Sequence, residues 1–315
     1  MTTAEISPPA VSPPVEQPSV EQPAVEQPAV ESPEVPPAAL PAPNRSAGTV
    51  PAQVARGLGR AIRTLGWFLA GTAVVIVAWQ VVAGLAEGLP TPLDSARTLS
   101  GMLADPFYDH GPNDKGVGIQ LAISLQRVFT GFLLAALVGI PAGLLLGSVR
   151  PAWMAFNPIV QVLRPVSPLA WYPIWLVVFK DPPPAAIFVI FITALWPTLI
   201  STAAGLADIP MDQRNVARVF RFGRFAYLRH VLVPNAMPSI ITGLRVSMGI
   251  GWMVIVAVEM LSGNSGIGYL VWDSYNAGRL DVVVAAIVLI GLIGFAIDSA
   301  LLWLSRRFAI EGVQS

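Results

Sequence analysis

Cysteine is absent from this chain of 315 residues, so disulfides, thiol catalysis and cysteine-ligated metals are excluded. The two histidines, His110 and His230, are far apart in sequence, and neither has the local spacing of a zinc site. The two lysines, Lys115 and Lys180, stand outside any Gly-x-x-x-x-Gly-Lys-[Ser/Thr] pattern that would hold phosphates. We therefore expect no enzyme, and no metal or cofactor bound by this chain.

Charge is also scarce, and hydrophobic residues take its place. Only 12% of the residues are charged and 54% are hydrophobic, with a mean hydropathy of +0.63. Residues 64–86, 128–149 and 182–207 carry no charge at all. About 20 apolar residues suffice for a helix to cross a hydrocarbon core of roughly 30 Å. The chain is therefore predicted to be an all-α polytopic membrane protein.

The arginines divide the chain into alternating sides of the membrane. Arginine groups precede the first predicted span and follow the second, fourth and sixth, whereas the segments 87–118 and 262–281 are acidic or nearly neutral. Because positive loops stay inside, both termini are predicted to be cytoplasmic. A short amphipathic helix is expected over 94–104 in the first external segment. The predicted spans are 64–86, 121–147, 151–179, 185–206, 238–261 and 282–304, the third of them broken by Arg164 and four prolines.

The first 53 residues differ from the rest. A five-residue repeat, "VEQPSVEQPAVEQPAVESPEV", carries proline in each unit and places Glu16, Glu21, Glu26 and Glu31 in step. Proline fixes φ and removes backbone donors, so this segment is predicted to be a disordered, extended tail. Residues 54–315 are then the transmembrane domain.

A dense basic stretch, "RNVARVFRFGRFAYLRHVLVPNAMP" at 214–238, interrupts the apolar chain. Val216, Val219 and Phe220 recur at helical spacing, and arginines recur on another face, so an amphipathic helix is predicted. Asp212 is the expected N-cap, and a second short helix over 225–233 is expected to end at Pro234. The stretch fits either a loop that sets topology and contacts anionic lipid, or a handle on which a soluble partner docks.

The spacing of this stretch resembles the signature loop of permease subunits of bacterial ATP-binding-cassette importers. That pattern runs Glu-Ala-Ala, three residues, Gly, nine residues, Ile, one residue, Leu-Pro. Identity is kept at Ala217 and Pro234, while Arg221 stands at the glycine and Gly223 is an alternative place for the bend. The resemblance implies a coupling loop over 207–234 whose contact residues are Asn215, Val216, Ala217, Arg218, Arg221, Gly223, Val231, Val233 and Pro234.

Other segments extend the resemblance over most of residues 60–310. "ISLQRVFTGFLLAALVGIPAGLLLG", "PVSPLAWYPIWLVVF", "ITGLRVSMGIGWMVIVAVEML" and "SGNSGIGYLVWDSYNAG" are similar to the nitrate, sulfonate, taurine and bicarbonate branch, the last most similar to nitrate/nitrite permeases. This implies a type I importer permease in the bacterial plasma membrane. Its implied partners are a second permease copy, a cytoplasmic ATPase dimer that uses ATP and Mg, and an external solute-binding protein. Nitrate or nitrite is the expected substrate, with sulfonate, taurine, cyanate or bicarbonate as alternatives.

An ion-coupled secondary transporter is the alternative from another class. It would more often show an internal repeat and a central carboxylate, and the sequence has neither.

Charged residues inside spans are costly against lipid, so they are expected to face the protein interior or a cavity. Arg164, Arg245 and Glu259 are the candidate pathway residues, and Arg245 lies nearest the middle of its span. Arg245 has a structural alternative, because it could pair with Glu259 or Asp298 and serve packing only.

Overall fold

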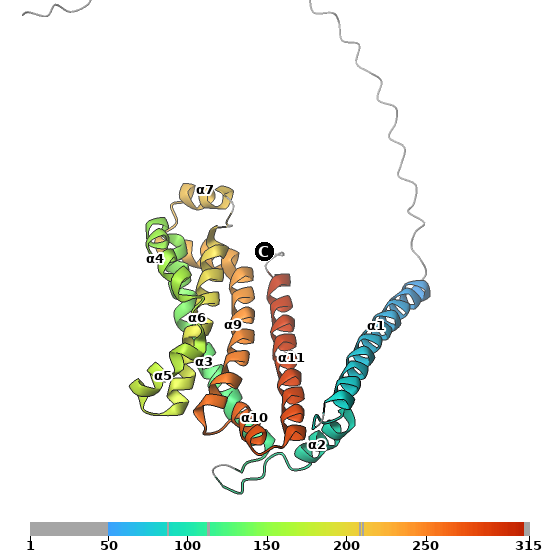
Figure 1. Cartoon of the computed structure of the whole chain (residues 1–315). Coiled ribbons are helices and arrows are strands. Elements are labelled where there is room, and N and C mark those ends of the chain that lie inside the picture. The colour runs from blue at the N-terminus through green and yellow to red at the C-terminus, as the bar shows by residue number, and fades with distance from the viewer. Residues whose placement is uncertain (1–49, 87, 112–113, 208, 210, 312–315) are drawn as a thin grey trace, which may run out of the picture. The chain divides into compact units, whose positions relative to one another are not determined.

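The computed structural model describes residues 50–311 apart from residues 87, 112, 113, 208 and 210 (Figure 1). The regular secondary structure of the described residues is helical, and their one β-type contact is an isolated bridge between Asp109 and Lys115. The predicted tail lies outside the described residues except for its last four, which belong to the first helix. The helices are α1 (Val50–Leu85), α2 (Pro92–Ala104), α3 (Val117–Ser148), α4 (Arg150–Leu163), α5 (Pro168–Phe179), α6 (Pro182–Ala207), α7 (Met211–Val219), α8 (Arg224–Tyr227), the π-helix Leu228–Leu232, α9 (Val233–Ser262), α10 (Ile267–Asn276) and α11 (Leu280–Glu311).

The predicted membrane architecture is confirmed. Five stretches are long and apolar enough to cross a membrane, and the pair α4 and α5 makes a sixth if the two are one span bent by 94°. Each predicted span overlaps one of these. The five helical stretches are Arg63–Leu85, Val117–Ser148, Pro182–Ala207, Phe225–Ser262 and Leu280–Arg306.

The bend between α4 and α5 follows from two prolines. The last helical bond of α4 is donated by the Arg164 amide to the carbonyl oxygen of Val160. Pro165 comes next and has no N–H with which to continue the helical bonding, and Ser167, which precedes Pro168, leaves the α conformation with φ −55° and ψ 129°. Pro168 opens α5, where its missing N–H costs nothing. The third span is therefore two short helices joined by a corner at residues 164–167.

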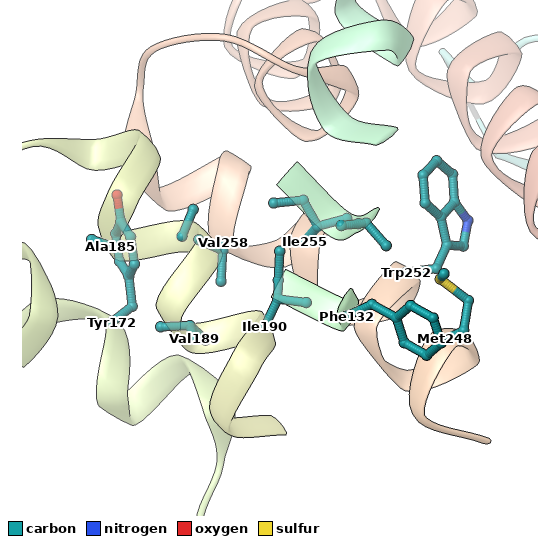
Figure 2. Packing of buried hydrophobic residues seen from close by; sticks show 11 residues of the cluster. Phe132, Tyr172, Ala185, Val189, Ile190, Met248, Trp252, Ile255 and Val258 are labelled. Atoms are coloured by element: carbon teal, nitrogen blue, oxygen red, sulfur yellow. The ribbon is translucent and has the colours of Figure 1, made fainter. Parts of the chain in front are cut away.

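Helices α3, α6 and α9 form the core of the bundle by close approach. A Cβ added at Gly131 of α3 would lie 2.8 Å from the carbonyl oxygen of Ile187 on α6, and one at Gly143 would lie 2.7 Å from that of Leu199. Any side chain larger than that of glycine at these two positions would push the helices apart, which is why small residues are common where membrane helices pack closely. Side chains of these three helices make a buried cluster that includes Phe132, Val189, Ile190, Met248, Trp252 and Ile255 (Figure 2).

Three predicted boundaries are corrected. Helix α2 begins at Pro92 rather than at residue 94, because the Thr91 hydroxyl accepts a hydrogen bond from the Asp94 amide and caps the helix. Asp212 lies in the first turn of α7 and is not its cap. The predicted break at Pro234 is wrong, since the π-helix runs directly into α9. The Val233 amide bonds to the Leu228 carbonyl in a wide turn that accommodates the proline ring.

Candidate functional site

The predicted coupling segment lies at one end of the bundle, which we call the α7 end. Figure 1 shows α7 at the opposite end of the bundle from α10. Ala217 is buried and packs with Leu206, Val231 and Leu232. Two aromatic side chains of the segment are largely exposed instead, Phe220 at 70% and Phe225 at 74%. Ala217 thus anchors α7 to the bundle, while the exposed rings lie just after α7, at Phe220, and in α8, at Phe225.

Arg221 makes the bend after α7. Its φ is +50°, in the left-handed region, and the Phe222 amide donates to the Ala217 carbonyl oxygen at 3.0 Å. That bond and that conformation define a Schellman motif, in which glycine is the usual residue at the left-handed position. Gly223, the alternative place for the bend, is not in the left-handed region. The arginine therefore adopts the conformation that the family's glycine would take.

The other predicted coupling residues fall on both sides of this turn. Asn215 is exposed on α7, Val231 is buried, Val233 is half-buried and Pro234 is exposed in the first turn of α9. The side chains of Val216 and Arg218 lie outside the described residues.

A buried ionic network occupies the opposite end of the bundle, which we call the α10 end. Glu259 of α9 is fully buried and Arg127 of α3 is 6% exposed. The Arg127 guanidinium donates to the Glu259 carboxylate at 2.8 Å and to the Ser265 carbonyl and hydroxyl oxygens at 2.6 and 2.9 Å. Ser124 donates to the second carboxylate oxygen at 2.7 Å. Both charges are paired and hydrogen-bonded, which is the condition for burying them.

Backbone amides at the start of α10 complete this network. The Gly266 amide donates to the Gln120 side-chain oxygen at 2.6 Å, and the Gly268 amide donates to Glu259 at 3.1 Å. Gly266 has φ +113°, and a Cβ there would overlap the Glu259 carboxylate. The glycines thus let the loop close over the acid. Glu259 was a predicted pathway residue, whereas Gln120 and Ser265 were not predicted, because nothing in a single sequence pairs residues so far apart.

Arg245 forms a bidentate ion pair with Asp298. Its Nε and Nη2 atoms donate to the two carboxylate oxygens at 2.6 Å each, which joins α9 to α11. A hollow of about 190 Å³ lies beside the pair and is also lined by Gly249, Trp252 and Gly294. Of the two partners considered for Arg245 from the sequence, the structure selects Asp298.

Arg164 sits at the corner between α4 and α5 beside a second hollow, of about 240 Å³. Among the described residues, no ion pair or hydrogen bond of its side chain is present. Helices α6 and α9 form the opposite walls. The polar and aromatic residues of the lining are Arg164, Ser167, Trp171, Thr193 and Trp196. Of the three predicted pathway residues, Arg164 alone has a charge without a described partner.

The chain belongs to the family of binding-protein-dependent transport system inner membrane components, which its residues 121–310 match. It is 44% identical over 227 residues to the nitrate import permease protein NrtB of Synechocystis sp., covering 72% of this chain and 82% of the relative. It is 43% identical over 242 residues to the bicarbonate transport system permease protein CmpB of Synechococcus elongatus, covering 76% and 87%. The putative aliphatic sulfonates transport permease protein SsuC of Bacillus subtilis is more distant, at 32% identity over 75% of this chain and 83% of its own length.

Solved structures agree on the fold. The inward-facing MetNI methionine ABC transporter matches 61% of this chain and 95% of the solved chain, with a TM-score of 0.56 at 18% identity. An amino acid ABC transporter crystallised with histidines matches 70% and 100%, with a TM-score of 0.54 at 14% identity.

The chain is therefore a transmembrane permease subunit of an ABC importer in the nitrate/bicarbonate branch. It is a transport component, and ATP hydrolysis belongs to a separate subunit. The predicted family and fold are confirmed, and the alternative of an ion-coupled secondary transporter is not supported.

Proposed function

We propose that this chain forms the translocation path of an ATP-driven importer for nitrate or nitrite. The observation that carries the substrate assignment is the 44% identity to the nitrate import permease proteins NrtB of two cyanobacteria, each over more than 80% of the relative's length. Bicarbonate is the second candidate, because the CmpB proteins follow at 43% identity. Aliphatic sulfonates are less favoured, since the SsuC protein is only 32% identical.

The proposed assembly contains two copies of the permease in a bacterial plasma membrane, with their termini in the cytoplasm. A cytoplasmic ATPase dimer, which uses ATP and Mg, binds the α7 end. The exposed rings of Phe220 and Phe225 support this docking, because aromatic side chains that fill pockets dominate protein interfaces. An external solute-binding protein delivers the anion to the α10 end, over residues 87–118 and 262–281.

The proposed coupling uses a continuous helical connection. Helix α8, the π-helix and α9 follow one another without a gap from Arg224 to Ser262. Closure of the ATPases would displace α7, and α9 would carry this displacement toward the α10 end. Coupling between distant sites requires such a rigid element with two discrete arrangements. Closure then opens the path outward, and hydrolysis resets it inward.

ATP hydrolysis by the reconstituted permease–ATPase complex tests the proposal. The complex is supplied with its binding protein and with nitrate, nitrite, bicarbonate, cyanate, taurine or an alkanesulfonate. Stimulation by nitrate or nitrite alone is expected. Stimulation by bicarbonate or sulfonates alone would retain the importer and replace its substrate, and failure of any ATPase to associate would refute the proposed partner.

A further inference from the structure

The hollow beside Arg164 lies at mid-height in the bundle. Thr193 and Trp196 stand near the middle of α6, and Val246 and Ile250 near the middle of α9, and all four line the hollow. A single water needs roughly 10–15 Å³ of such space, so about 240 Å³ holds a small ion together with several waters. The space is therefore large enough for a partly hydrated small anion at the depth where hydration is hardest to replace.

The lining is suited to negative charge. The lining residues that the structure describes include one cation and no acidic side chain. Arg164, the Ser167 hydroxyl and the indole N–H groups of Trp171 and Trp196 are all donors, and guanidinium and indole groups cannot accept a hydrogen bond. An ion that leaves water without a compensating partner loses many kcal/mol, so the guanidinium of Arg164, which is exposed at the corner, is the feature that would make this depth tolerable for an anion.

The other two arginines inside the predicted spans, Arg127 and Arg245, are already paired with acidic side chains. Arg127 is enclosed with Glu259, and Arg245 is bound in two places by Asp298. Arg164 has no such partner among the described residues, although an unpaired charge at membrane depth is costly and usually functional.

We propose that the hollow at the corner of α4 and α5 is a binding site for the transported anion within the membrane, with Arg164 as its charged ligand. The proposal rests on the proposed function, because it takes the substrate to be a small oxyanion. A planar guanidinium matches the oxygens of such an anion through two parallel N–H donors. The indole walls favour a weakly hydrated ion over a strongly hydrated one.

Uptake of labelled nitrate into proteoliposomes holding the complete importer tests the site. Four variants are compared with the original chain, and binding-protein-stimulated ATP hydrolysis is measured in parallel. Arg164→Gln removes the charge and Arg164→Lys keeps it. Arg150→Gln removes the same charge at the first residue of α4, away from the hollow. Val246→Phe narrows the hollow from the α9 side, where Val246 lines the hollow and is 47% exposed, which leaves space for part of the larger ring.

Arg164→Gln is expected to lower uptake at least about tenfold, as loss of a charged hydrogen bond does, while stimulated hydrolysis continues. Val246→Phe is expected to lower uptake as well. Arg164→Lys is expected to lower it less than Arg164→Gln does, because the charge remains while the two parallel N–H donors are lost, and Arg150→Gln is expected to retain most of it. If Arg164→Gln takes up nitrate as fast as the original chain, the site is wrong and the importer stands. The same holds if Arg164→Lys loses as much uptake as Arg164→Gln. If Arg164→Gln fails to assemble, undiminished uptake by Val246→Phe would overturn it. No uptake of any anion by the original chain would instead refute the proposed function.

Discussion

The two ends of the bundle are built on opposite principles. At the α10 end, Arg127 and Glu259 are enclosed, and side chains from α3 and amides from α10 satisfy both charges. At the α7 end, Phe220 and Phe225 lie exposed, and Arg221 occupies a backbone conformation that favours glycine. The buried charges of the first end are satisfied within one chain, whereas the second end has a strained bend and two exposed rings that are available to a partner. This difference indicates where the fold is stabilised and where it transmits motion, and substitutions at the two ends should separate these effects.

The largest expected effect is on stability at the α10 end. Glu259→Ala leaves the Arg127 guanidinium buried without its counter-charge, which typically costs about 3–5 kcal/mol. We expect a large drop in the melting temperature of the detergent-solubilised permease–ATPase complex, with little change in the affinity for the ATPase. Asp181→Asn is the control, because it neutralises an exposed acid whose side chain has no ion pair or hydrogen bond among the described residues, and it should change stability by no more than about 0.5 kcal/mol.

A double variant sharpens this result. Replacing both Arg127 and Glu259 with leucine removes the charges together, so it should cost less than the sum of the two single replacements. Melting of Glu259→Ala at the original temperature would show that the network does not stabilise this end.

The next effect is on association at the α7 end. Phe220→Ala should weaken binding of the ATPase by about 2 kcal/mol, roughly 30-fold in Kd, because a ring seated in a partner pocket contributes on this scale. The melting temperature of the permease alone should not change. Phe107→Ala is the matched control, since its ring is 69% exposed and lies before α3, at the α10 end. Equal binding by Phe220→Ala would mean that the exposed rings are not a docking surface.

A smaller effect is expected at the bend. Arg221→Gly removes the left-handed penalty of about 1 kcal/mol, part of which the greater freedom of glycine in the unfolded segment offsets. Hydrogen exchange of the Phe222 amide, which bonds to Ala217, should slow by a few-fold as a result. Arg221→Val should accelerate it, because a β-branched residue tolerates this conformation poorly. Faster exchange in the glycine variant would argue against strain at this position.

The smallest effect concerns pH at the periphery of the α10 end. Lys115 donates to Asp109 at 2.6 Å, and this hydrogen bond, together with one from the Gly111 amide, lowers the pKa of the Asp109 carboxyl from its ordinary value. Because the folded pKa is lowered, the stabilisation is present above the ordinary value of 3.8 and is lost as the pH falls through the folded pKa. The His110 amide lies beside this ion pair, so its hydrogen exchange should lose protection on acidification in the original chain. The Asp109→Asn variant lacks the titrating carboxyl, and protection of the same amide should not change with pH in it.

Much of the fold was predictable because its signals are local. Uncharged runs mark the spans, and the prolines around Arg164 predict the broken third span, which the structure forms as two helices bent by 94°. The position of the bend after α7 was harder to predict from the sequence, since Arg221 and Gly223 were both candidates. The Schellman bond from Phe222 to Ala217 selects Arg221, and that bond depends on where α7 ends.

The pairing of membrane charges was not predictable. Arg164, Arg245 and Glu259 look alike in sequence as isolated charges in apolar runs. Their partners depend on how each helix is rotated and packed against helices far away in the chain. Only the assembled bundle joins Arg245 to Asp298, encloses Glu259 with Arg127, and leaves Arg164 beside an open space.

Labelled nitrate uptake by proteoliposomes holding the permease, the ATPase and the binding protein tests the central claim most directly. The account predicts that nitrate accumulates above its external concentration only when ATP and the binding protein are both present, and that Phe220→Ala lowers this accumulation. Uptake that merely equalises the two concentrations, with or without ATP, would contradict it.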